Sequence, residues 1–352
     1  MPLIVEPKHS GPSAELLTRA PLTIGLVNNM PDAAVEATER QFAELIRGAS
    51  SEVAVRLKRF SIPEMPRAAP VQAEMATRYR DISELWETHV DGLIVTGTEP
   101  RADSLADEPY WPAFRRLLAW ARDNTASTIW SCLAAHAAVL ESDGIERRPF
   151  ADKLFGVFDC ETVFTHPLLR VARPPLAVPH SRFNDLPEPA LAASGYDILT
   201  RSAVTGADAF VREERGGSLF VFFQGHPEYE TGTLVREYRR DVARFLRGER
   251  DRFPTTPQNY FKGDAASLAE TFRAGAINNP HEGLVADFPL DRLEAGVENT
   301  WRGAAVGIYR NWISYLKERK ASPRALFGPP PSRRSRRALD RRRPALERSV
   351  AR

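Results

Sequence analysis

The chain has 352 residues, of which 43% are hydrophobic and 27% charged, the composition of an ordinary globular protein. This length is enough for one large domain or two modest ones. No apolar run approaches the roughly 18 residues needed to cross a bilayer. The first residues lack the basic start and apolar middle of a signal peptide. The composition therefore argues against a membrane protein and predicts a cytoplasmic location.

The net charge of +2 hides a basic tail. Residues 322–352 hold ten arginines and two acidic residues, a net charge of +8, which leaves −6 on the preceding 321 residues. Aromatic residues are not interleaved through the arginine clusters, and the body of the chain is acidic. We therefore expect a disordered, solvated tail and no nucleic-acid partner.

The two cysteines, Cys132 and Cys160, are too few for a disulfide framework. No Cys-x-x-Cys or His-x-x-x-His pair indicates a metal site, so no metal is expected. Cys160 lies in a β-like stretch and is interpreted as structural. His136 is interpreted as structural or solvated.

Strand-like and helix-like segments alternate through the first 145 residues. After an expected loose leader over residues 1–20, the sequence predicts strands at 22–28, 53–60, 92–96 and 129–131, and helices at 33–47, 70–88 and 111–122. Asp32 is placed to cap the first of these helices. Such alternation predicts an α/β fold in which helices cover both faces of a parallel sheet.

The later part of the chain is richer in predicted strands. They cover residues 156–163, 168–172, 196–202, 209–211 and 219–224, and are followed by a helix at 231–247, a loop-rich stretch at 262–290 and a closing helix at 298–318. We expect residues 21–321 to form a single domain.

Three chemically suggestive segments follow predicted strands directly. They are Thr96-Gly97-Thr98, Cys132 and Gly225-His226. In open α/β sheets, ligands bind outside the carboxyl ends of the strands. These segments are therefore expected to lie at one active site.

Cys132 is the candidate nucleophile. It lies between an apolar strand and a helix of small residues, as does a nucleophile held at a sharp strand-to-helix turn. A thiol at a helix N-terminus is favoured as the thiolate by the helix dipole. Backbone N–H groups at the turn, including that of Leu133, can form an oxyanion hole. An isolated cysteine is more often a buried structural thiol, but this context favours the catalytic interpretation.

His226 and Glu228 are the candidate base and its partner. His226 is the first polar side chain beyond the predicted strand, and Glu228, two residues later, would orient it and stabilise its charged form. A surface His-Pro-Glu turn is the alternative, which the presence of Cys132 makes weaker. A Cys, a His and a Glu in this order indicate covalent acyl chemistry.

A third segment, His180-Ser181-Arg182, follows a proline and precedes Asn184-Asp185, so it is predicted to be an irregular loop. Its serine and arginine would suit a substrate carboxylate, which arginine binds with two parallel hydrogen bonds. An ordinary turn with a salt bridge is the alternative interpretation.

Several short blocks, taken together, resemble the homoserine O-acyltransferases of the succinyltransferase type, which begin methionine biosynthesis. The resemblance runs over about residues 21–261 and again over 301–315. It rests on Asn29-Met30-Pro31, Gly92-Leu93-Ile94-Val95-Thr96-Gly97, Tyr110-Trp111, the Cys132 turn, Lys153-Leu154-Phe155-Gly156-Val157, Pro179-His180-Ser181-Arg182, Gly225-His226-Pro227-Glu228-Tyr229, Arg240-Asp241 and Asn259-Tyr260-Phe261. That family has a flavodoxin-like fold similar to class I glutamine amidotransferases.

The resemblance implies a role for each matching residue. Cys132 would carry the acyl group as a thioester, with His226 as base and Glu228 as its partner. Lys153, Ser181 and Arg240 would contact the substrate. The implied mechanism is ping-pong: acyl-coenzyme A acylates the enzyme, coenzyme A leaves, and L-homoserine accepts the group. The family also implies a homodimer, with acyl-coenzyme A as co-substrate and no resident cofactor.

One position in the family is linked to the choice of acyl donor. The family carries Gly there for succinyl and Glu for acetyl, and the spacing places Arg101 at this position. A cation can pair with the free carboxylate of a succinyl group, whereas an acetyl group offers none. Arg101 is therefore a candidate substrate contact that favours succinyl, and homoserine O-acetylation with acetyl-coenzyme A is the alternative.

Two other functions remain open. A glutamine-amidotransferase-like hydrolase would use the same three residues with water or ammonia. Such enzymes usually carry Gly on both sides of the nucleophile, where Ser131 and Leu133 stand here. The other function is that of a non-enzymatic regulatory or binding protein, which would have no need for an intact Cys, His and Glu set.

Overall fold

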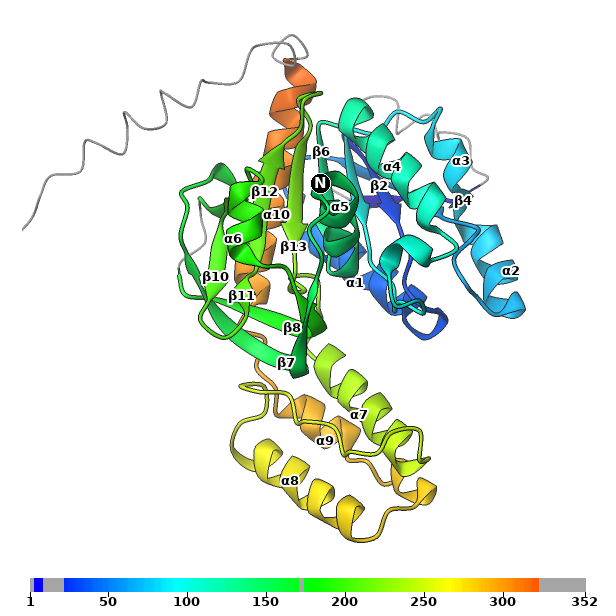
Figure 1. Cartoon of the computed structure of the whole chain (residues 1–352), viewed down its shortest axis with the longest axis vertical. Coiled ribbons are helices and arrows are strands. Elements are labelled where there is room, and N and C mark those ends of the chain that lie inside the picture. The colour runs from blue at the N-terminus through cyan, green and yellow to red at the C-terminus, as the bar shows by residue number, and fades with distance from the viewer. Residues whose placement is uncertain (1–2, 9–21, 171–173, 323–352) are drawn as a thin grey trace, which may run out of the picture.

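The structure is a computed structural model that describes residues 3–8, 22–170 and 174–322 (Figure 1). Within them, a sheet of nine strands runs in the order β1-β3-β2-β5-β6-β13-β12-β9, with β4 paired to β3. Its strands are β1 (Leu3–Val5), β2 (Leu22–Val27), β3 (Val55–Ser61), β4 (Arg80–Asp81), β5 (Gly92–Val95), β6 (Ser127–Ser131), β9 (Asp197–Ile198), β12 (Ala209–Glu213) and β13 (Leu219–Phe223). The pairs from β1 to β13 are parallel, and β12 and β9 pair antiparallel.

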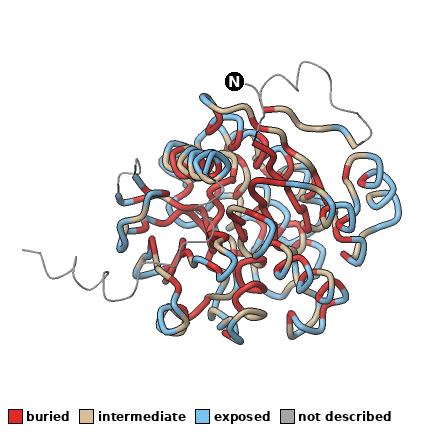
Figure 2. Tube along the Cα trace, turned by 90° about the horizontal axis from the view of Figure 1, so that it is seen from above, coloured by how far each residue is buried: buried red, intermediate tan, exposed pale blue. Residues whose placement is uncertain are grey.

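Helices cover both faces of this sheet, so the predicted α/β fold class is confirmed. The helices concerned are α1 (Val35–Ala49), α2 (Ala69–Arg78), α3 (Ile82–Leu85), α4 (Trp111–Asn124), α5 (Leu133–Asp143), α6 (Glu188–Ala193) and α10 (Arg302–Ala321). Consecutive strand residues point to opposite faces: Ile94 packs with α1 and α10, whereas Leu93 packs with α3, α4 and α5. Figure 2 shows the buried segments gathered in the interior of the trace. Among the described residues, no helix is long and apolar enough to cross a membrane.

A second sheet and a group of helices extend the core. The sheet has the order β11-β10-β7-β8, with β7 (Arg148–Thr162), β8 (Leu176–Asp185), β10 (Thr200–Ser202) and β11 (Gly206–Ala207). In Figure 1 the helices α7 (Thr233–Leu246), α8 (Gly263–Asn278) and α9 (Leu290–Ala295) lie together below β7 and β8. They share a separate apolar cluster with Phe155 and Val157 of β7. Short 3-10 helices occur at Asp32–Ala34, Pro167–Leu169, Leu105–Asp107 and Glu282–Val285.

The strands that the sequence predicted in the first half are confirmed, and the differences lie between them. Residues 3–5 of the expected loose leader form β1, which pairs with β3. The predicted helix at 70–88 is split into α2, β4 and α3, because Asp81 caps a new helix by accepting a hydrogen bond from the Ser83 amide. Asp32 does not cap α1; its carboxylate accepts a hydrogen bond from the Ala68 amide at 2.8 Å.

Three later predictions are wrong. Residues 167–169 form a 3-10 helix in place of the predicted strand at 168–172, and residues 171 and 172 lie outside the described part. The stretch at 262–290, expected to be loop-rich, holds α8 and the start of α9. His180-Ser181-Arg182 belongs to β8, where it pairs with β7. Residues 1–2 and 9–20 of the leader and the basic tail from residue 323 also lie outside the described part.

A close backbone contact ties the helical group to β7. The Gln258 amide donates to the Phe155 carbonyl, and the Val157 amide donates to the Gln258 carbonyl, both at 2.9 Å. Gly156 lies between them with φ of 146°, a conformation that only glycine adopts readily. A Cβ at this position would come within 2.3 Å of the Gln258 carbonyl oxygen.

We expect Gly156→Ala to lower the free energy of unfolding by about 3 kcal/mol, because a backbone clash adds to the strained φ. Chemical denaturation measures this change. Gly275→Ala is the matched control, since it lies in α8 with nothing within 4 Å of the added Cβ. In a helix the control should be neutral or slightly stabilising. Equal stability of the two variants would contradict a close backbone contact between Gly156 and Gln258.

Candidate active site

The parallel register of β6 and β13 brings Cys132 and His226 together. Ser131 at the end of β6 pairs with Phe223 at the end of β13. The Cys132 amide then donates a hydrogen bond of 2.7 Å to the Phe223 carbonyl. Cys132 has φ of 52° and ψ of −116°, a strained conformation for a residue with a side chain, and α5 begins at the next residue. This is the predicted nucleophile turn, at the carboxyl end of the sheet.

His226 lies between the thiol and a carboxylate. Its Nδ1 is 2.8 Å from Oε1 of Glu228, and its side chain also hydrogen bonds to Cys132. His226 and Glu228 are only 5% and 3% exposed, whereas Cys132 is partly accessible. The Tyr229 ring stacks on the imidazole with 4.2 Å between centroids. The structure thus brings the three predicted catalytic side chains into one chain of contacts.

The charges around His226 favour its protonated form. Burial alone would lower its pKa, but the negative charges of Cys132 and Glu228, with the hydrogen bonds to both, hold the pKa well above the usual 6.5. The thiolate is the nucleophilic form of cysteine, and a protonated imidazole next to it can give its proton to a leaving group. The contact of ring and sulfur is the arrangement that such chemistry requires.

A polar cluster lies beside this triad. The Lys153 ammonium of β7 lies 3.0 Å from Asp241 and 3.5 Å from Glu237, both on α7. The Ser181 hydroxyl of β8 donates to Glu237, and the Tyr229 hydroxyl donates to the same carboxylate at 2.6 Å. Tyr229 therefore links the cluster to the imidazole on which its ring stacks. The predicted contacts Lys153 and Ser181 meet here.

Glu237 is the ionised centre of this cluster. Burial alone would raise its pKa, but the charge of Lys153 and the hydrogen bonds from Ser181 and Tyr229 hold the pKa below its usual value. A largely buried carboxylate that Tyr229 links to the imidazole is a natural counterpart for a substrate cation. Among the described residues, no three His, Cys, Asp or Glu side chains gather as a metal site would require.

The remaining predicted residues, Arg240 and Arg101, are more exposed than the triad. Arg240 of α7 is 3.0 Å from Asp241, and its side chain is 44% exposed. The Arg101 side chain is exposed, and the Arg101 amide donates to Glu108. The loop that carries Arg101 reaches α7, because Glu99 lies 3.6 Å from Arg244. The structure thus places Arg101 on the side of the site that α7 borders, but in no contact with the triad.

The site belongs to a known enzyme family. The sequence profile of homoserine O-succinyltransferases matches residues 11–322. The chain is 48% identical over 295 residues to the homoserine O-succinyltransferase of Rhodopseudomonas palustris, covering 84% of this chain and 88% of that protein. It is 48% identical over 298 residues to the enzyme of that name from Bradyrhizobium japonicum, covering 84% and 90%. The chain belongs to the homoserine O-succinyltransferase family.

Solved structures similar to this member of the homoserine O-succinyltransferase family include glutamine amidotransferases. One, from Thermotoga maritima, is 12% identical with a TM-score of 0.46 and covers 85% of this chain and 100% of that one. Another, from Methylobacillus flagellatus, is 16% identical with a TM-score of 0.45 and covers 84% and 95%.

Reasoning from the sequence missed Tyr229 and Glu237. Tyr229 directly follows the predicted Glu228, but nothing in the sequence says that its ring stacks on His226. Glu237 was detectable, because it precedes the predicted Arg240 by three residues on a helix, and residues three apart share a helix face.

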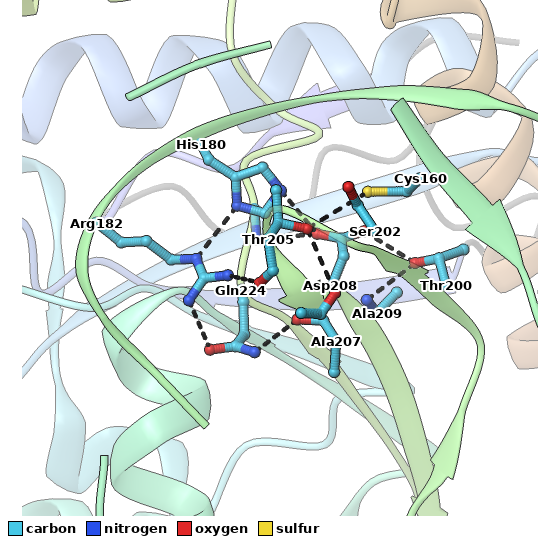
Figure 3. Close-up of polar contacts among 12 residues, drawn as sticks. Cys160, His180, Arg182, Thr200, Ser202, Thr205, Ala207, Asp208, Ala209 and Gln224 are labelled. Carbon is cyan, nitrogen blue, oxygen red and sulfur yellow. Dashed lines mark hydrogen bonds and ion pairs between the residues drawn. The ribbon is translucent and has the colours of Figure 1, made fainter. Parts of the chain in front are cut away.

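A buried polar network holds the residues that precede His226 (Figure 3). Gln224 accepts a hydrogen bond from Arg182 at 3.3 Å and donates to the Ala207 carbonyl at 2.6 Å. Asp208 accepts from the Gly225 amide at 3.1 Å. These contacts fix the two residues that precede His226, and the His226 amide donates to the Pro179 carbonyl at 2.8 Å.

This network overturns the interpretation of Arg182 as a carboxylate-binding residue. Arg182 is buried in β8, and its guanidinium bonds to Asp185 at 2.9 Å and to the His180 ring at 3.3 Å. All three of its nitrogen atoms are thus engaged within this buried network. His136 is also structural, as expected: it lies 2.9 Å from Gln224, and burial and the charge of Arg182 lower its pKa to about 3.

Gly97 packs directly against the start of α5. A Cβ at this position would lie 2.8 Å from the Leu133 amide nitrogen and 2.7 Å from the Leu133 Cβ. The β5 loop therefore touches the amide that was predicted to form an oxyanion hole.

We expect Gly97→Ala to lower kcat about 100-fold, the usual loss when one oxyanion donor is displaced. Steady-state kinetics would measure it, and circular dichroism would check the fold. Gly144→Ala is a control at the other end of α5, with nothing within 4 Å of the added Cβ but with φ of +65°. It should cost some stability but leave kcat unchanged. A normal kcat in Gly97→Ala would show that the contact between Gly97 and the Leu133 amide does not matter for catalysis.

Proposed function

We propose that the chain transfers a succinyl group from succinyl-coenzyme A to the side-chain hydroxyl of L-homoserine, through a thioester on Cys132. Two observations support this: the membership of the homoserine O-succinyltransferase family, and the contact of Cys132, His226 and Glu228 at the adjacent ends of β6 and β13. The contact carries the mechanism, because a transfer through an acyl-enzyme needs a nucleophile with an adjacent base.

In the first half-reaction the Cys132 thiolate attacks the thioester carbonyl of succinyl-coenzyme A. The oxyanion of the tetrahedral intermediate would be stabilised by the Leu133 amide at the N-terminus of α5. As the intermediate collapses, the bond to coenzyme A breaks, and the imidazolium of His226 protonates the leaving thiolate. The succinyl group is then held on Cys132.

In the second half-reaction His226, now neutral, takes the proton of the homoserine hydroxyl as its oxygen attacks the Cys132 thioester. Collapse of this intermediate releases O-succinylhomoserine and regenerates the thiolate–imidazolium pair. Glu228 stabilises the imidazolium at both stages, because its Oε1 accepts from Nδ1. The proton that the ring gives to coenzyme A is therefore replaced by the one that it takes from homoserine, and the ring ends the cycle protonated as it began.

The polar cluster next to the triad suits the acceptor. Homoserine carries an ammonium and a carboxylate. The ionised Glu237 matches the ammonium, while Arg240 and Lys153 match the carboxylate. Ser181 and Tyr229 hold Glu237 by hydrogen bonds and so fix its position. This arrangement would place the homoserine hydroxyl at the imidazole.

The proposal extends to the pathway, the cellular location and the oligomeric state of the enzyme. Acylation of homoserine would place it at the start of methionine biosynthesis. We also propose a cytoplasmic location, where such biosynthesis draws on acyl-coenzyme A, and a homodimer, as the family resemblance implies.

The thioester is tested by intact mass spectrometry. Incubated with succinyl-coenzyme A and no homoserine, the protein should gain the mass of one succinyl group and release one coenzyme A. Cys132→Ala should gain nothing, because the sulfur that holds the group is missing. Cys160→Ala is the control, since Cys160 is fully buried.

Added homoserine should remove the bound group and yield O-succinylhomoserine. No adduct in the wild-type protein, or an adduct that persists in Cys132→Ala, would refute the proposed mechanism. Hydrolysis of glutamine without any adduct from acyl-coenzyme A would indicate an amidotransferase-like hydrolase in its place.

The donor preference depends on Arg101. We expect Arg101→Glu to lower the ratio of kcat/KM for succinyl- over acetyl-coenzyme A about fivefold, since reversing the charge changes the interaction with the succinyl carboxylate by about 1 kcal/mol in total. Competition between the two donors measures this ratio. Arg47→Glu is the control, because Arg47 lies in the last turn of α1, at the opposite edge of the sheet. An unchanged ratio would remove Arg101 from donor selection.

A further inference from the structure

Asn29 lies two residues beyond the end of β2 and has no part in the proposed mechanism. It is buried, with 4% of its surface exposed. Its amide donates a hydrogen bond of 2.8 Å to the hydroxyl of Thr96, and its side-chain Nδ2 donates one of 3.0 Å to the carbonyl of Thr96. The backbone and the side chain of Asn29 therefore both bind the residue that directly follows β5.

These contacts extend the pairing of β2 and β5. The parallel ladder of the two strands ends at Val27 and Val95, and the Thr96 amide donates to the Val27 carbonyl at 3.0 Å. The Thr96 hydroxyl, which accepts from Asn29, also donates to the Gly97 carbonyl at 3.2 Å. The amide, hydroxyl and carbonyl of Thr96 are all engaged, so the direction in which the chain leaves β5 is fixed.

The chain that leaves β5 in this direction meets the start of α5. Gly97 is so close to Leu133 that a Cβ on Gly97 would lie 2.8 Å from the Leu133 amide nitrogen. Asn29, Gly97 and Leu133 also line one cavity. A continuous path of contacts therefore runs from Asn29 through Thr96 and Gly97 to the amide that would stabilise the oxyanion.

We propose that Asn29 is a positioning residue for acyl transfer. By fixing Thr96 it holds the Gly97 backbone against Leu133. The Leu133 amide is thereby kept in place for the oxyanion that develops as Cys132 attacks the thioester carbonyl. Such donors are effective because they are in place before the reaction, and a misplacement of about 1 Å can cost about 100-fold in rate. The inference rests on the proposed function, since it concerns the same acyl transfer.

Two reactions of the same sulfur separate this role from a merely structural one. Acylation by succinyl-coenzyme A passes through a tetrahedral intermediate that carries an oxyanion. Alkylation by iodoacetamide does not: the Cys132 thiolate attacks the methylene carbon, the carbon–iodine bond breaks, and iodide leaves in one step. Loss of an oxyanion contact should therefore slow acylation alone, whereas a disturbed triad or fold should slow both. Quenched intact-mass measurements give both rates, and Cys160 does not interfere because it is fully buried.

Asn29→Ala removes the hydrogen bond from Nδ2 to the Thr96 carbonyl. We expect acylation to slow about tenfold, which corresponds to about 1.4 kcal/mol and lies within the range of a single hydrogen bond. Alkylation should stay within about twofold of the wild-type rate, because it depends on the thiolate and not on the Leu133 amide.

Thr96→Val is a second variant, which removes the hydroxyl between Asn29 and Gly97 and keeps the size of the side chain. It should show the same pattern, with slower acylation and unchanged alkylation. Thr96→Ser keeps the hydroxyl and should restore acylation to within about twofold of wild type.

Asn311→Ala is the matched control. Asn311 of α10 also donates from Nδ2 to a backbone carbonyl, that of Leu168, at 2.9 Å. Helix α10 packs on the face of the large sheet opposite to α5. The control should lose a similar free energy of unfolding and leave both rates unchanged.

A double variant tests whether Asn29 acts through Gly97. In a Gly97→Ala background, Asn29→Ala should slow acylation by no more than about threefold further, because the contact that it supports is already displaced. A loss as large as in the wild-type background would overturn the inference. Equal slowing of acylation and alkylation in both Asn29→Ala and Thr96→Val would overturn it too, since the effect would then be structural.

The wild-type protein separates this inference from the proposed function. If iodoacetamide alkylates the wild type but succinyl-coenzyme A does not acylate it, the proposed function fails and the role of Asn29 fails with it. If the wild type is acylated, and Asn29→Ala and Thr96→Val are acylated at the same rate, the proposed function stands and only the inference fails.

Discussion

A single backbone hydrogen bond, from the Cys132 amide to the Phe223 carbonyl, sets the geometry of the site. It continues the parallel ladder of β6 and β13 by one residue beyond Ser131. It therefore holds Cys132 at a φ of 52°, a conformation that a side chain normally avoids. The strain is tolerated because the fully buried strands on both sides over-determine the backbone. The sulfur is thus held where the chain leaving β13 places the imidazole.

The triad and the polar cluster beside it come from different layers of the molecule. The nucleophile, base and carboxylate belong to the large parallel sheet, whereas Lys153 and Ser181 belong to the hairpin of β7 and β8. Glu237 of α7 and Tyr229 of the turn join the layers through hydrogen bonds. In the proposed function, this division separates the residues that would perform acyl transfer from those that would bind the acceptor. On that proposal, changes in the hairpin and α7 would alter the acceptor without disturbing the strand register that places Cys132.

The features that the sequence predicted are those fixed by local pattern. Cys132 could be placed because an apolar strand and a helix of small residues flank it, and His226 because it ends another strand. Parallel strands put such ends at one edge, so their meeting followed from fold class alone. Arg182 was misassigned for a related reason. Proline and asparagine near it suggested a loop, but pairing of β8 with β7 over ten residues overrode the local turn signals.

The closing helix α10 shows why the remaining features of the site could not be predicted from local sequence patterns. Its periodic apolar face predicted a helix, and Trp312 and Leu316 do pack on the sheet. The same periodicity predicts that Tyr309 is buried, but it does not say what its side chain contacts. That this ring stacks on Phe223, at the end of the strand that leads to His226, is a property of three-dimensional packing. The sequence therefore identifies the helix and its buried face, whereas only the fold determines which strand end that face covers.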